Sequence, residues 1–173
     1  NPSGKLPFTF PKKLTDNGAH YFGEHSYPGV DFEQNYEEGI LVGYRWHDTM
    51  GIDAEFAFGH GLSYTDFSIE GIVVNSVQYH LDDDIRIALS ISNTGKMAGS
   101  EVVQVYVGKP NSKVHRAKKE LKGFKKVDLR PSETKQITID IPVSDLNYYD
   151  PDRANWHLER GMYHLFVGTA SDQ

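Results

Sequence analysis

The sequence predicts an all-β fold, an antiparallel sandwich preceded by a long extended arm at the amino end. From about residue 67 onward, short runs of alternating apolar and polar residues are separated by clusters of turn residues. About seven such runs fit into roughly 105 residues, which is typical of an immunoglobulin-like or fibronectin type III-like sandwich. No run has the period of an amphipathic helix. We therefore predict one sandwich domain over residues 67–173.

Residues 1–66 are expected to form the arm and not a self-standing domain. Prolines at positions 2, 7, 11 and 28 and frequent glycines interrupt any regular element. The arm is nevertheless rich in aromatic residues, and large exposed apolar patches usually mark contact surfaces. We expect the arm to pack against other domains, and an uncovered arm to self-associate through its strand edge and aromatic surface.

Residues 84–93 form the clearest predicted strand. Ile85, Ile87, Leu89 and Ile91 alternate with polar or small residues, so one face belongs to the core and the other to solvent. Residues 134–142 repeat this pattern and end at Pro142, which lacks a donor for the ladder. The other strands are expected at 68–79, 100–108, 120–129 and 162–168, with a kinked pair near 146–149 and 156–159.

Length and composition limit the classes of function that are possible for this chain. A chain of 173 residues forms at most one ordinary domain with an arm or two small ones, which excludes a large enzyme core. The net charge of −6 argues against general nucleic-acid binding, and no apolar run is long enough to cross a membrane. With no cysteine, disulfides and thiolate metal sites are impossible. The amino end has no signal-peptide pattern, so we expect a piece of a longer protein whose compartment stays open.

Several motifs, in this order, resemble the carboxy-terminal part of family 3 glycoside hydrolases, the β-glucosidase family. They are Asn1-Pro-Ser-Gly-Lys-Leu-Pro-Phe-Thr-Phe-Pro11, Tyr36-Glu-Glu-Gly-Ile-Leu-Val-Gly-Tyr-Arg-Trp-His-Asp48, Phe56-Ala-Phe-Gly-His-Gly-Leu-Ser-Tyr-Thr-Asp-Phe67, Asn93-Thr-Gly-Lys-Met-Ala-Gly-Ser-Glu-Val-Val-Gln-Val-Tyr-Val107, Lys119-Glu-Leu-Lys-Gly-Phe-Lys-Lys126 and Gly161-Met-Tyr-His-Leu-Phe-Val-Gly168. The matches extend over nearly the whole chain. Two small departures are Trp46-His47, where aromatic pairs are usual, and His60, where Tyr or His is common.

The resemblance implies a domain order. In this family a catalytic (β/α)8 barrel is followed by an α/β sandwich domain and, in many members, by a fibronectin type III-like domain. Residues 1–11 resemble the last strand region of the α/β domain, residues 36–48 and 56–67 the connecting segment, and residues 68–173 the final domain. The family's aspartate nucleophile and acid/base glutamate lie upstream of Asn1, so no catalytic residue is implied here.

The resemblance also implies partners. We expect the catalytic barrel and the α/β domain of the parent enzyme to contact the arm, and the long loop 109–118 could reach over them. The residues expected at this interdomain contact are Tyr36, Glu38, Tyr44, Arg45, Trp46, Asp48, Phe58, His60 and Tyr64.

Other combinations of residues suggest catalysis, and for each a structural interpretation is favoured. Glu37 and Glu38 could serve as a carboxylate pair, but neighbours on an extended segment point in opposite directions. The Gly59-His-Gly61 motif lacks the spacing and lysine of a phosphate loop and predicts a tight turn. His60, Ser63 and Asp66 have triad chemistry, but closeness in sequence is not triad geometry.

Some residues could bind metals, nucleic acid or sugars, but a structural role is favoured for each. Asp82, Asp83 and Asp84 could bind calcium, but an exposed turn is favoured; no metal and no cofactor are predicted. In the basic run 113–126, Leu121, Phe124 and Val127 are interpreted as inward strand positions beneath solvated lysines. Trp46, Trp156, Tyr148 and Tyr149 could stack on sugar, but a place in the core or in an interdomain contact is favoured.

The function predicted from the sequence is a non-catalytic module that braces the catalytic domains of a β-glucosidase-like enzyme. By resemblance, the parent would hydrolyse terminal β-linked glucosides with retention, and this chain alone would be inactive. Two alternatives remain: an autonomous carbohydrate-binding module, and a sandwich that binds a partner protein.

Overall fold

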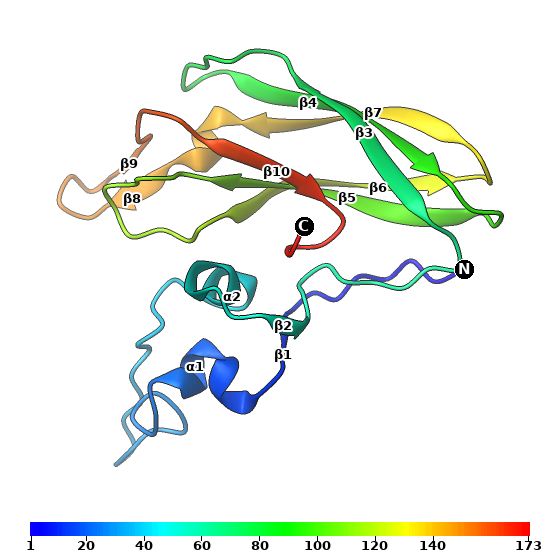
Figure 1. Cartoon of the computed structure of the whole chain (residues 1–173). Coiled ribbons are helices and arrows are strands. Elements are labelled where there is room, and N and C mark those ends of the chain that lie inside the picture. Colours follow the sequence, from blue (N-terminus) through cyan, green and yellow to red (C-terminus); the bar gives the residue numbers. More distant parts are fainter.

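Two three-stranded antiparallel sheets face each other and enclose the core (Figure 1). The computed structural model describes all residues from 1 to 173. One sheet has the order β3-β4-β7, with β3 at Phe67–Val74, β4 at Asp84–Asn93 and β7 at Thr134–Pro142. The other has the order β10-β5-β6, with β10 at His164–Gly168, β5 at Gly99–Gly108 and β6 at Glu120–Leu129. The predicted all-β, fibronectin type III-like fold class is confirmed.

The remaining elements of the sandwich region follow β7. A short 3-10 helix, η2 (Val143–Leu146), leads into a hairpin of β8 (Tyr148–Asp150) and β9 (Asn155–His157). The region therefore contains eight strands, β3 to β10, because the expected kinked pair is a separate hairpin. None of the helices has the length and hydropathy that a membrane crossing requires.

The core lies between the two sheets and contains 14 buried aliphatic side chains. On β4 and β7 the buried positions alternate as the sequence predicts, and the register places Ile87 opposite Ile139 and Ile85 opposite Ile141. Full burial of each aliphatic side chain contributes about 1.5–3 kcal/mol relative to exposure. Because these residues share one face of the sheet, shifting the register of β4 against β7 by one residue would turn all of the inward side chains of the shifted strand toward solvent.

Strand β5 differs from β4 because both of its faces are buried. Val103, Val105 and Val107 point into the core. On the opposite face, Gln104 is only 3% exposed and Tyr106 is fully buried. The segments before β3 cover this outer face, as the contacts described below establish.

Phe124 does not point inward as the sequence analysis predicts; it is 68% exposed. That prediction is wrong because Phe124 and Val127 lie three residues apart on a stretch of β6 without a bulge, so their side chains face opposite sides. Val127 belongs to the core, and Phe124 therefore lies on the outer face. The inward prediction for Leu121 is also wrong: the register of β6 against β5 shifts between Val105 and Tyr106, so Leu121, which pairs with Tyr106, lies on the outer face as well.

The arm lies against one side of the sandwich and contains short regular elements (Figure 1). These are β1 (Phe10–Pro11), η1 (Leu14–Asp16), α1 (Gly18–Tyr21), α2 (Tyr44–Met50) and β2 (Ala54–Phe56). The sequence did not predict α2, because seven residues are too few to show a helical period. Its limits are set by glycines with positive φ, Gly43 at 62° and Gly51 at 66°. The division between arm and domain at residue 66 stays a prediction.

Two stretches of the arm run side by side. Strand β1 pairs with β2, and further along the Leu6 amide donates to the His60 carbonyl at 2.8 Å while the Gly59 amide donates to the Leu6 carbonyl at 2.8 Å. The backbones approach so closely that a Cβ on Gly61 would lie 2.5 Å from the Gly4 carbonyl oxygen. The Gly59-His-Gly61 motif is thus a turn and a close contact, in which the His60 amide donates to the Ala57 carbonyl at 3.0 Å.

We predict that Gly61→Ala lowers the free energy of unfolding by about 1–3 kcal/mol, because the added methyl group would force two backbones apart. Urea denaturation monitored by fluorescence measures this. Gly4→Ala is the matched control, since a Cβ at Gly4 meets no atom within 4 Å. Equal midpoints for the two variants would contradict the close pairing of these stretches.

Candidate functional site

The candidate site is the surface at which the arm meets the sandwich, called here the arm–sandwich seam. The arm contributes residues 1–6, α2 and residues 57–65. The sandwich contributes the outer face of the β10-β5-β6 sheet, the loop 109–119 and the residues after β10. The seam consists of an aromatic anchor, a buried ion pair and a polar region, described in turn below.

Tyr44, the first residue of α2, anchors the arm to the sheet. Its hydroxyl accepts a hydrogen bond from the Leu121 amide at 2.8 Å. Its ring packs on Tyr106 with the centroids 5.6 Å apart and on Phe58 at 5.0 Å. Burial raises the pKa of the Tyr44 hydroxyl and, more strongly, that of Tyr106. Both phenols therefore stay neutral over the physiological range and act as packing and hydrogen-bonding groups.

Trp46 extends this anchor into the arm. The side chain is 3% exposed, and its indole N–H donates to the Asp16 carbonyl at 3.0 Å. It forms a small buried cluster with Leu41 of the arm and Ala117 of the loop 109–119. The arm's own small core thus includes a residue of the sandwich region, so the two parts share buried apolar surface.

A buried cation lies beside α2. Lys119 is 7% exposed, its ammonium donates to the Ser171 carbonyl, and it lies 3.7 Å from a carboxylate oxygen of Asp48. The rings of Tyr106 and Phe166 each lie 5.3 Å from the Lys119 ammonium. Burial raises the pKa of Asp48, and the positive charge of Lys119 partly opposes this rise.

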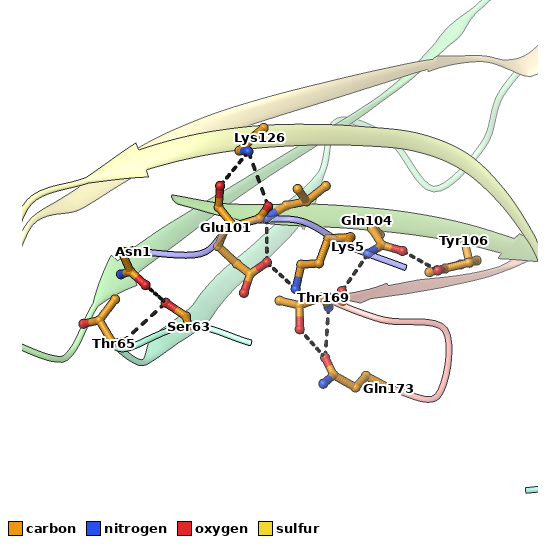
Figure 2. Close-up of polar contacts among 12 residues, drawn as sticks. Asn1, Lys5, Ser63, Thr65, Glu101, Gln104, Tyr106, Lys126, Thr169 and Gln173 are labelled. Carbon is orange, nitrogen blue, oxygen red and sulfur yellow. Dashed lines mark hydrogen bonds and ion pairs between the residues drawn. The ribbon is translucent and has the colours of Figure 1, made fainter. Parts of the chain in front are cut away.

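The polar region of the seam holds the first residues of the chain (Figure 2). Lys5 and Glu101 form an ion pair at 2.6 Å, with their side chains 16% and 11% exposed. Lys126 donates to the Ser3 hydroxyl at 2.8 Å. The Gln104 amide donates to the Thr169 carbonyl at 2.6 Å, which ties the end of β10 to β5.

Five of the nine expected contact residues lie in the seam: Tyr44, Arg45, Trp46, Asp48 and Phe58. Arg45 Nε is 3.5 Å from a Glu120 carboxylate oxygen, and the Phe58 carbonyl accepts from the Ser171 amide at 2.8 Å. His60 contributes its backbone, and its ring packs on Phe56 at 5.0 Å.

The other three expected residues do not join the seam through their side chains. Tyr36 is 75% exposed and Tyr64 is 72% exposed. One carboxylate oxygen of Glu38 is buried without a hydrogen-bond partner. Contact of any of the nine residues with further domains stays a prediction.

The residues that suggested catalysis are not arranged for it. No hydrogen bond joins His60, Ser63 and Asp66; the Ser63 hydroxyl instead donates to the Asn1 side chain at 3.1 Å. Among the acidic residues of the turn before β4, Asp83 accepts from the His80 amide at 2.6 Å. No group of three or more His, Cys, Asp or Glu side chains is placed to hold a metal ion.

The aromatic residues proposed for sugar stacking separate into two groups. Trp46 is buried, as described above. Trp156 and Tyr149, on the β8–β9 hairpin, are 62% and 51% exposed. Their rings are 5.6 Å apart at an angle of 71°, so they do not form one flat platform.

The residues on the sandwich side of the seam were not predicted from the sequence. Glu101, Gln104, Tyr106 and Lys119 are all buried there. One signal was available, because Tyr106 lies two residues after Gln104 and shares its face of the strand, and a large aromatic side chain there suggests that something covers that face. Their partners could not be identified, since they come from positions about 50–100 residues away along the chain.

Comparisons with known proteins agree with the motifs. Residues 101–171 match the model of the fibronectin type III-like domain. The chain is 43% identical over 170 residues to β-glucosidase BoGH3A of Bacteroides ovatus, covering 98% of this chain and 23% of that protein. It is also 43% identical over 171 residues to thermostable β-glucosidase B of Acetivibrio thermocellus, covering 99% of this chain and 22% of that one.

Solved structures match over the same extent. The β-glucosidase DesR of Streptomyces venezuelae, solved with D-glucose, superposes with a TM-score of 0.90 at 40% identity, covering 99% of this chain and 22% of DesR. The β-glucosidase of Kluyveromyces marxianus gives a TM-score of 0.84 at 43% identity, covering 99% and 20%. The chain thus spans about a fifth to a quarter of the length of these relatives. The chain therefore corresponds to the carboxy-terminal, fibronectin type III-like domain region of glycoside hydrolase family 3 β-glucosidases.

Proposed function

We propose that this chain is a non-catalytic module that braces the catalytic domains of a β-glucosidase-type enzyme. The proposal rests on the difference between the two sides of the arm. One side is fixed to the sandwich through the seam, whereas the other exposes large apolar side chains. These include Phe8 at 49%, Phe10 at 44%, Phe32 at 112%, Ile40 at 54% and Val42 at 63% exposure.

An exposed apolar surface of this kind is typical of a contact with another domain. The relatives named above are four to five times as long as this chain, which supports further domains as the occupants. A domain that packs on the outer side of the arm would be held in a fixed orientation to the sandwich. The hydrogen bond of Tyr44 and the ion pair of Lys5 with Glu101 would hold the arm, and with it that domain, in place on the sandwich.

The activity that we propose for the parent is retaining hydrolysis of terminal β-linked glucosides, in line with the names of the relatives. Retention requires two carboxyl groups about 5 Å apart across a sugar site. Glu37 and Glu38 are adjacent in sequence, and Glu37 is exposed. We therefore assign catalysis to residues outside this chain and expect the isolated chain to be inactive.

A carbohydrate-binding module is the second candidate, favoured by the exposed rings of Trp156 and Tyr149. Sugar-binding sites offer an aromatic face together with polar groups, and Asp150 and Asn155 form the next pair along this hairpin. Titration with cello-oligosaccharides separates the two candidates. Saturable binding lost in Trp156→Ala would favour the module over the brace.

We predict that the chain alone does not hydrolyse a chromogenic β-glucoside. A relative truncated before the region equivalent to residue 1 should gain activity or thermal stability when this chain is added, because the exposed side of the arm becomes covered. Activity of the chain alone that survives repurification and is lost in Glu37→Gln or Glu38→Gln would overturn the proposal.

We predict that Tyr44→Phe lowers the free energy of unfolding by about 1 kcal/mol or more, because the buried Leu121 amide loses its acceptor. Tyr64→Phe is the matched control, since the Tyr64 hydroxyl makes no hydrogen bond and its side chain is 72% exposed. Urea denaturation compares the two. An unchanged stability of Tyr44→Phe would show that this hydrogen bond does not hold the seam.

We predict a pH effect at Asp48. Its pKa is raised in the folded state by burial, so folding retains a proton that the unfolded chain loses at about pH 4. The contribution of Asp48 to stability is therefore greatest at low pH and declines as the pH rises through its folded pKa. Asp48→Asn should remove this decline.

Denaturation of wild type and Asp48→Asn at a series of pH values measures the difference. Asp53→Asn is the control, because that carboxylate is 86% exposed. Parallel pH profiles for wild type and Asp48→Asn would rule out this role for Asp48.

A further inference from the structure

A cleft of about 450 Å³ opens beside the loop 109–118, at the end of the sandwich where β5 ends and β10 begins. Thr49, at the end of α2, and His164 and Phe166, on β10, line its other walls. The volume is within the range of small-molecule sites, which is about 300–1,000 Å³. The cleft is separate from the exposed side of the arm used in the proposed function.

The walls of this cleft are strongly basic. Lys109, Arg116 and Lys118 line it together with His115 and His164, and no Asp or Glu does. Between Glu101 and Glu120 the sequence contains five Lys and Arg residues and no acid. This concentration stands out because the whole chain has a net charge of −6. A concave surface lined by one sign of charge attracts ligands of the opposite sign.

The carboxylates near the cleft interact with other groups of the protein. Glu159 accepts from the Ser112 hydroxyl at 2.7 Å and from the Lys113 amide at 2.8 Å. These hydrogen bonds, with smaller contributions from Lys109 and Arg116, lower the pKa of Glu159, so it stays ionised and fixes the loop. Asp48 faces Lys119 in the seam.

The guanidinium of Arg116 and the backbone of Lys118 are held by the protein before any ligand arrives. One guanidinium nitrogen of Arg116 donates to the Leu146 carbonyl at 2.6 Å, and the group lies 5.9 Å from the Tyr148 ring centroid. Its other terminal nitrogen, Nη1, is buried and has no hydrogen-bond partner in the protein. The Lys118 amide donates to the Thr49 hydroxyl at 3.0 Å, which fixes the backbone at that wall.

We propose that this cleft binds an oxyanion with at least two negative charges, phosphate or sulfate, either free or carried by a small sugar. Planar guanidinium and flexible ammonium groups together are the side chains that such groups prefer. The space exceeds that of a single phosphate, so a sugar ring attached to the anion can be accommodated. The proposal stands independently of the brace.

Calorimetric titration of the full 173-residue chain at low ionic strength tests the proposal. The ligands are inorganic phosphate, sulfate, glucose 6-phosphate and glucose. We expect saturable binding of the anions, none of glucose, and weaker binding at high salt. Amide chemical shifts should change in residues 108–118 and 164–166. Tighter binding of glucose 6-phosphate than of phosphate would indicate a sugar-borne anion, and equal binding a free one.

The double variant Lys109→Ala/Lys118→Ala should weaken anion binding about tenfold or more, because charge-assisted hydrogen bonds are lost. Lys96→Ala is the matched control: Lys96 is exposed, forms no ion pair or hydrogen bond, and lies in the turn before β5, at the other end of that strand. An unchanged amide spectrum outside the cleft shows that the double variant is folded.

Three results would overturn the proposal. They are the absence of saturable anion binding, equal affinity for glucose and glucose 6-phosphate, and equal weakening by the double variant and by Lys96→Ala. Should the double variant fail to fold, Lys118→Ala alone provides the test, because that side chain is exposed.

Discussion

Strand β5 must be covered on both faces, and the rest of the structure depends on this constraint. Its inner face packs against the β3-β4-β7 sheet through valines, as in any sandwich. Its outer face presents Gln104 and Tyr106, whose polar atoms require partners once they are buried. The arm and the residues after β10 supply that cover. The sandwich and the arm are therefore one packing unit, although the sequence reads as two regions.

The cover combines apolar packing with buried polar pairs. Aromatic contacts around Tyr44 and Trp46 contribute buried apolar surface to the seam. The Lys5–Glu101 and Lys119–Asp48 pairs add less net stability, since removing charges from water costs nearly what their attraction returns. Such pairs do restrict how the arm can sit, because a shifted arm would leave a buried charge without its partner. That restriction suits a module that holds other domains in a fixed orientation.

The loop 109–119 links the seam to the basic cleft. Ala117 is buried in the small core of the arm, and it lines the cleft together with its neighbours Arg116 and Lys118. Lys119 then enters the seam beneath α2. One loop therefore contributes residues to both the seam and the cleft.

The sequence alone determined the strands whose side chains alternate between core and solvent. Residues 84–93 and 134–142 follow the period of two closely enough to predict both their extent and their inward faces. The motifs also determined the family, because they survive as local patterns. The error at Phe124 comes from grouping it with Val127 three residues away, because side chains of a strand alternate between its two faces. The error at Leu121 has another cause: a bulge changes the face on which it lies, and the sequence shows no sign of that bulge.

Only the tertiary structure decided the seam and the cleft. Helix α2 is too short to show a period, and its Tyr44 finds a partner 77 positions along the chain. The pairing of Lys5 with Glu101 and of Lys119 with Asp48 likewise depends on how the arm folds back over β5. The spacing of apolar residues indicates which face of a helix or strand is buried, but contacts between distant segments depend on how the whole chain packs. For that reason, the sequence predicted the sandwich in detail and the seam only in outline.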